Sequence, residues 1–202
     1  MANFQQAYVK MIGHEGGYSD KSTDRGGETY KGISRVNFPK WEGWPLVDAY
    51  KAEGPFTEKS LTEKLDNDPQ LNRLVAVFYK SVFWDKLRLD RIASQAIANE
   101  LFDTGVNQGA GTAAKYLQES INLLNRNATV CKDIAVDGGI GNQTLGAYEA
   151  ILKYHAKYGS GLIEDTIVKC LNGLQFERYR AICKKRPQQE ANFFGWVTNR
   201  ID

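Results

Sequence analysis

Three residues near the N-terminus, Glu15, Asp24 and Thr29, have types and spacing that suit acid–base chemistry. Glu15 is followed by two glycines and a tyrosine, and a second glycine pair, Gly26-Gly27, lies between Asp24 and Thr29. Paired glycines favour a tight reversal of the chain, so the two carboxyl groups and the hydroxyl can converge. Glycoside hydrolysis needs such a pair: a protonated carboxyl donates to the leaving oxygen, and a carboxylate activates water or stabilises charge on the sugar. We therefore take residues 14–33 as the candidate active site.

The second catalytic group stays open between several residues of this segment. Asp24 precedes Arg-Gly-Gly, where an aspartate can also serve only to stabilise a turn through bonds to nearby amides. Asp20 and Glu28 are competing carboxylates, and Thr29 either holds water or stabilises the turn. With two histidines in the chain, His14 and His155, no metal set is assembled, and we expect neither a metal nor a cofactor.

A short helix must position Glu15. Apolar residues recur at helical spacing from Phe4 to Ile12, which predicts an amphipathic helix over residues 3 to about 13. Glu15 then lies at a helix C-terminus, where the dipole disfavours ionisation. Burial against Tyr18 or Tyr30 would disfavour it further. Both effects raise a carboxyl pKa, as a general acid requires.

Aromatic and amide side chains supply candidate substrate-binding groups. Residues 37–56 hold prolines and tryptophans in a pattern too irregular for a regular element, which predicts a cleft wall or lid. Aromatic rings can stack on sugars, and an amide can bond an N-acetyl group or cap a helix. The candidates for substrate binding are Tyr18, Tyr30, Trp41, Trp44 and Asn107, whereas Trp84 is expected in the core.

The rest of the chain predicts a mainly α fold with at most a small β-hairpin around residues 18–34. Apolar stripes predict helices that start at Asp68-Pro69 and cover about 92–106, 111–124, 142–155 and 161–180. A glycine-rich loop at 136–144 lacks the ending of a phosphate-binding loop. The chain loosens near 107–112, so we expect a domain over residues 1–106 and a second, helical one over 107–202.

Composition excludes several classes of protein. The 202 residues are 42% hydrophobic, enough for a core without metals or disulfides, and the net charge of +2 gives no support for nucleic-acid binding. The three cysteines show no metal spacing and are expected to be buried or idle thiols. No apolar run is long enough for a membrane span, and the first residues do not resemble a signal peptide.

Several motifs together resemble glycoside hydrolase family 108, which includes lysozyme-like N-acetylmuramidases and secretion-activator proteins. The resemblance spans nearly the whole chain. In the first half it rests on Glu15-Gly16-Gly17-Tyr18, Asp24-x-Gly26-Gly27-x-Thr29, Gly32-Ile33, Phe83-Trp84 and Asp103-x-x-Val106-Asn107-x-Gly109. The resemblance continues through Leu117-Gln118. The C-terminal part resembles the family's predicted peptidoglycan-binding domain through Asp137-Gly138-x-x-Gly141-x-x-Thr144-Leu145 and Phe194-Gly195-Trp196-Val197-x-Asn199-Arg200.

The resemblance implies a lysozyme-like fold and a muramidase in which Glu15 is the catalytic acid. The bond cleaved would be the β-1,4 bond between N-acetylmuramic acid and N-acetylglucosamine in peptidoglycan, the one expected partner. Two departures concern the second carboxylate. Asp24 and Thr29 lie one residue closer than the matching pair of phage lysozymes, and Arg25 stands where proline is common.

Two other functions compete with the muramidase. A lytic transglycosylase would use one glutamate as acid and then base and leave anhydro-sugar ends. A non-catalytic peptidoglycan-binding or secretion-assisting protein would use the shape alone. For all three we expect a monomer made in a bacterial or phage-infected cytoplasm, without a signal peptide. It would reach the wall through a holin, as a phage endolysin does, or through a dedicated export system.

Overall fold

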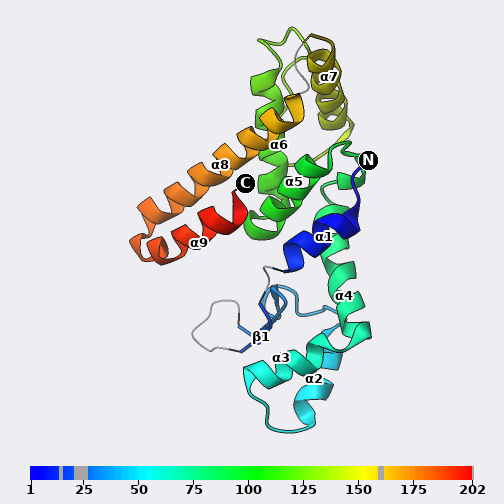
Figure 1. Cartoon of the computed structure of the whole chain (residues 1–202), viewed down its shortest axis with the longest axis vertical. Helices are drawn as coiled ribbons and strands as arrows, with labels where there is room; N and C mark the ends of the chain where they lie inside the picture. Colours follow the sequence, from blue (N-terminus) through cyan, green and yellow to red (C-terminus); the bar gives the residue numbers. More distant parts are fainter. Residues whose placement is uncertain (14–15, 21–26, 159–161, 202) are drawn as a thin grey trace. The chain divides into compact units, whose positions relative to one another are not determined.

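The computed structural model describes residues 1–13, 16–20, 27–158 and 162–201. It is mainly α-helical, as predicted, with one small antiparallel sheet (Figure 1). The chain forms two compact units. The smaller unit comprises residues 8–82, and the larger unit comprises residues 1–7 with 83–202. No helix among the described residues is long and apolar enough to cross a membrane.

The smaller unit is built from a three-stranded sheet and short helices. Its strands, β1 (Tyr18–Ser19), β2 (Thr29–Tyr30) and β3 (Ile33–Ser34), lie in sequence order and are antiparallel. Lys31 and Gly32, the two residues between β2 and β3, both have positive φ, of 46° and 75°. Two such residues make the tight turn whose twist matches a hairpin, which is why a glycine follows the lysine.

The helices of the smaller unit agree with the sequence analysis only in part. The predicted N-terminal helix is confirmed as α1 (Phe4–Ile12), and Asp68 caps α4 (Pro69–Tyr79) by accepting bonds from the amides of Gln70 and Leu71. The prediction that residues 37–56 are irregular is wrong, because α2 (Trp44–Ala52) begins there. Its proline falls in the first turn, where no amide proton is needed. Helix α3 (Glu58–Asp66), capped by Thr57, was not predicted.

Aromatic side chains fill the core of the smaller unit. The rings of Trp41 and Trp44 meet edge to face with centroids 5.1 Å apart, and those of Phe38 and Phe78 do so at 4.7 Å. Gly43 makes this possible, because a Cβ there would lie 2.3 Å from the Trp41 ring. Rings packed this way contribute more than their buried area alone.

The larger unit is an α-helical assembly. After a π-helical turn at Lys80–Trp84, the chain forms α5 (Gln95–Gln108), α6 (Ala110–Leu124), α7 (Asn142–Tyr158), α8 (Ile163–Lys185) and α9 (Glu190–Arg200). The first four were predicted, with ends that differ by a few residues, and α9 was not. Helices α8 and α9 pack against each other as a hairpin (Figure 1). Trp84 is 1% exposed, which confirms its predicted core position.

The predicted domain boundary, at residue 106, falls within a helix. Residues 106 and 107 lie inside α5, one turn before its end. This helix packs on α6 and α8 within the larger unit. A division of function at residue 106 stays a prediction.

A buried amide, that of Gln118 on α6, holds the glycine-rich loop of the larger unit. Its Nε2 donates to Asp137 Oδ1 at 2.8 Å, to the Gly139 carbonyl at 3.0 Å and to Thr144 Oγ1 at 3.2 Å. Its Oε1 accepts from the Gly138 amide at 3.0 Å. The bond from Gln118 and one from the Gly139 amide also hold the pKa of Asp137 below its usual range. The motif around this loop therefore has a structural role.

Replacing Gln118 with leucine is expected to lower the free energy of unfolding by about 1–3 kcal/mol, because the buried loop groups lose their partner. Urea unfolding of the whole chain measures this. Gln188→Leu, at an exposed glutamine, is the matched control. Equal stability of the two variants would contradict the role assigned to Gln118.

Candidate functional site

The chain that follows Glu15 is fixed by a close backbone approach. Glu15 itself, its neighbour His14 and Asp24 lie outside the described residues. The Tyr18 amide donates to Thr62 Oγ1 on α3 at 2.8 Å. A Cβ on Gly17 would lie only 2.3 Å from Thr62 Cγ2, whereas a Cβ on Gly16 would meet no atom of the described residues within 4 Å. Of the two glycines after Glu15, Gly17 is therefore required by packing and Gly16 is not.

The sheet joins the two ends of the segment that carries the candidate residues. Tyr18 pairs with Tyr30, and Ser19 pairs with Thr29, so the start and the end of residues 19–29 lie side by side. The Thr29 hydroxyl donates to the Gly27 carbonyl at 3.1 Å. Thr29 thus stabilises the turn in this structure, one of its two predicted uses, and its oxygen keeps a lone pair with which to accept another bond.

Glu28 is the centre of a charge cluster at the base of this segment. Its Oε1 accepts from the Tyr18 hydroxyl at 2.9 Å and from Lys51 Nζ at 2.8 Å, and its Oε2 lies 2.5 Å from Arg35 Nε. Arg35 also forms a two-pronged pair with Asp48 and covers the Trp44 ring at 4.3 Å. The Glu28 side chain is only 12% exposed. Both of its oxygens are engaged, so Glu28 is a poor candidate for activating water.

Asp20, in contrast to Glu28, lies in exposed surroundings. Its side chain is 53% exposed, and Lys51 Nζ lies 3.9 Å from its Oδ2. Its amide donates to Glu58 Oε1 at 3.1 Å, which ties the strand end to α3. Asp20, Tyr18 and Lys51 line one side of a pocket of about 330 Å³. The Tyr18 hydroxyl donates a long bond to Asp20 Oδ2, at 3.5 Å, and the exposed carboxylate at this pocket can still act on a bound molecule.

The cluster shifts the pKa values of its members. Burial, together with the bond to Glu28, raises the pKa of the Tyr18 hydroxyl to about 12. Partial burial lowers the pKa of Lys51, but its bonds to Glu28 and Tyr18 outweigh this and raise it overall. At neutral pH Tyr18 is therefore a neutral donor and Lys51 a cation.

The structure corrects the expectation that Tyr30 and Trp44 lie open to a sugar. Tyr30 is 0% exposed and bonds Asp66 through its hydroxyl, and Trp44 is 2% exposed and donates its indole N–H to the Phe38 carbonyl. Both rings are covered by other side chains. Trp41 is 9% exposed and borders a pocket of about 370 Å³ beside Phe38, so its role in binding stays a prediction.

Asn107 belongs to the larger unit, whereas the charge cluster around Glu28 belongs to the smaller one. It is exposed near the end of α5, where its Nδ2 donates to the carbonyl and the carboxylate of Asp103 at 2.9 and 3.1 Å. These bonds tie its amide to its own helix. Its carbonyl oxygen remains available as an acceptor.

The sequence analysis missed Thr62, Lys51 and Arg35, which hold the candidate site. Lys51 and Arg35 are ordinary charged residues with no motif around them. Only the pairing of carboxylates with distant cations, here 23 residues apart for Glu28 and Lys51, could have indicated them.

We expect Gly17→Ala to lower the free energy of unfolding by about 1–3 kcal/mol, since the new Cβ overlaps Thr62. Gly16→Ala is the matched control and should change it by less than about 0.5 kcal/mol. Thermal unfolding of both variants measures the difference. Gly17→Ala with wild-type stability would contradict the close approach.

Comparisons with known proteins cover both halves of the chain. The family described as Glycosyl hydrolase 108 matches residues 8–109, and that described as Predicted Peptidoglycan domain matches residues 112–201. The solved structure of SagA from Brucella abortus resembles this one with a TM-score of 0.58 at 20% identity. The match covers 98% of this chain and 88% of that chain, which shows a shared fold. No curated protein matches the chain.

The first match spans half of the chain and includes the carboxylate-bearing segment of the smaller unit, and the second includes the loop held by Gln118. The predicted resemblance is thereby confirmed. The chain belongs to the glycosyl hydrolase 108 family and is a glycoside hydrolase that acts on peptidoglycan.

Proposed function

We propose that the chain is a lysozyme-type N-acetylmuramidase, with Glu15 as its general acid. Its bond would be the β-1,4 linkage between N-acetylmuramic acid and N-acetylglucosamine. The observation that carries the proposal is the family match over residues 8–109, which contains Glu15 in its Glu-Gly-Gly-Tyr context. The contacts of Gly17 and Tyr18 with Thr62 support it, because they fix the chain that leads from this glutamate.

Cleavage of a glycosidic bond requires a proton for the leaving oxygen and a water molecule for the anomeric carbon. Glu15 donates its proton to the glycosidic oxygen as the bond from that oxygen to the anomeric carbon breaks. Water then bonds to the anomeric carbon, and its proton passes to a carboxylate. Asp24 or Asp20 would take this second role, with Thr29 as a group that orients water. Glu28 does not enter, since Tyr18, Lys51 and Arg35 occupy its oxygens.

We also propose where this activity would be used. The enzyme would act on the cell wall as a monomer, after export through a holin or a dedicated secretion system. Phage lysis and remodelling of the wall for secretion would use the same chemistry.

Glu15→Gln is expected to reduce peptidoglycan hydrolysis by about 10²–10⁴-fold, the usual contribution of a general acid. Turbidity loss of purified peptidoglycan measures the rate, and mass analysis of the fragments measures the product ends. Glu42→Gln, at an exposed glutamate of the same unit, is the control and should keep full activity.

Reducing N-acetylmuramic acid ends from the wild type would support the muramidase, whereas anhydro ends would establish the transglycosylase instead. Equal rates for Glu15→Gln and the control would exclude Glu15 as the acid. A wild type that binds peptidoglycan without cleaving it would be the non-catalytic protein.

Measurements of unfolding stability and of the hydrolysis rate together distinguish the roles of the carboxylates on this segment. Glu28→Gln should lower the free energy of unfolding by about 1–3 kcal/mol, because Lys51 and Arg35 lose their charged acceptor. Asp20→Asn should leave stability within about 0.5 kcal/mol of wild type, since the side chain is half exposed. Of Asp20→Asn and Asp24→Asn, the one that loses activity while still folded identifies the second catalytic group. If Glu28→Gln keeps full stability, the charge cluster does not have the role assigned to it.

A further inference from the structure

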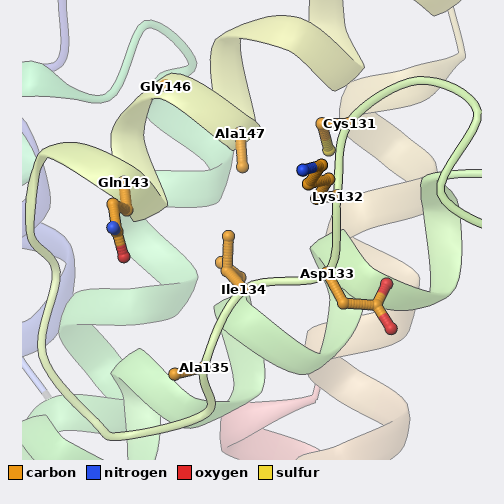
Figure 2. Close-up of a pocket in the computed structure, with 8 residues that line it drawn as sticks. All are labelled: Cys131, Lys132, Asp133, Ile134, Ala135, Gln143, Gly146 and Ala147. Atoms are coloured by element: carbon orange, nitrogen blue, oxygen red, sulfur yellow. The ribbon is translucent and has the colours of Figure 1, made fainter.

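The larger unit contains a groove that the proposed chemistry does not use. Its volume is about 400 Å³, within the range of ligand sites. One wall is the segment from Cys131 to Ala135, and the other is the first turns of α7 (Figure 2). The side chains of Ile134 and Ala147 point toward each other across it (Figure 2).

The wall formed by residues 131–135 includes backbone amides and carbonyls that form no hydrogen bonds within the described part of the chain. The amide and the carbonyl of Ile134 both bond to the side chain of Asn122 on α6, at 2.9 Å each. Among the described residues, no backbone hydrogen bond joins Lys132, Asp133 or Ala135 to the rest of the chain. An extended peptide can add to such an edge.

The helix wall holds two small residues, Gly146 and Ala147, beside the larger Gln143. Gln143, Gly146 and Ala147 are spaced three and four apart, which places them on one face of α7. A Cβ on Gly146 would meet nothing within 4 Å, so the absent side chain leaves space for a ligand. Side chains of alanine size fit such a wall.

The groove is lined by one cation, Lys132, and one carboxylate, Asp133. The Asp133 carboxylate accepts a bond from Asn125 Nδ2 and points away from Ala147 (Figure 2). Lys132 is exposed, and within the described part of the chain its ammonium has no ion-pair or hydrogen-bond partner. The exposed Gln143 amide adds a neutral donor and acceptor.

We propose that this groove binds the peptide stem of peptidoglycan, an acidic peptide that contains alanine residues. The unpaired edge would bond its backbone, the wall at Gly146 would receive an alanine, and Lys132 would pair with a carboxylate. The proposal rests on the proposed function, and all the lining residues fall within the match to the Predicted Peptidoglycan domain.

The test uses the full chain and the soluble stem tetrapeptide L-Ala, D-Glu, meso-diaminopimelate, D-Ala. We expect amide NMR shifts at residues 132–135 and 143–147 during titration. Gly146→Leu should weaken binding by at least about tenfold by filling the groove, and Lys132→Glu should weaken it by a salt-dependent factor. Two matched controls should bind as wild type: Gly173→Leu, at another helical glycine with open space, and Lys169→Glu, at another exposed lysine.

Wild-type binding by Gly146→Leu, or peptide-induced shifts confined to other residues, would overturn the proposal. Hydrolysis of peptide-free glycan by the wild type, measured in parallel, separates this failure from that of the proposed function. Cleavage without peptide binding would refute only the proposal that the groove binds the stem peptide. Peptide binding without cleavage would refute the muramidase and leave the groove standing.

Discussion

The half-buried carboxylate of Glu28 is the constraint on which the candidate site depends. Its partners come from three places: Tyr18 on β1, Lys51 on α2 and Arg35 after β3. A charge with so little exposure is stable only when its oxygens are paired, so the strands and the helix must meet around it. The contact of Gly17 with Thr62 then fixes the segment from the α3 side. The chain is therefore held at Gly17 and at Glu28, before and after the part of the sequence that contains Asp24.

Most of the helices could be predicted from the sequence, because each has a long apolar stripe. Helix α2 was missed since its tryptophans and prolines match an irregular segment, and its stability comes from ring packing between Trp41 and Trp44 that no periodicity reveals. Helix α3 was missed for another reason. It is short and mostly charged, with only Leu61 and Leu65 buried, and its start depends on a capping box at Thr57.

In the candidate site too, local sequence patterns supported predictions, whereas contacts between distant residues did not. Residue types and glycine spacing indicated the segment and its chemistry. The tertiary partners of Glu28 could not be predicted, and neither could the burial of Tyr30 and Trp44, because an aromatic residue in a loop has the same local pattern whether it faces a core or a sugar. Distant contacts decide that, such as the bond from Tyr30 to Asp66.

The side chains that fix the segment after α6 are different from those that face the proposed groove. Gln118 and Asn122 lie on α6, and Asn125 directly follows it. These three side chains bond residues 133–139 through backbone groups and the Asp133 and Asp137 carboxylates. The side chains of Lys132 and Ala135 take no part in these bonds. Their identities are therefore free to vary between relatives at little cost in stability, so a family with this architecture can change what the segment recognises while keeping its scaffold. The same arrangement makes the segment a natural place to graft a new specificity.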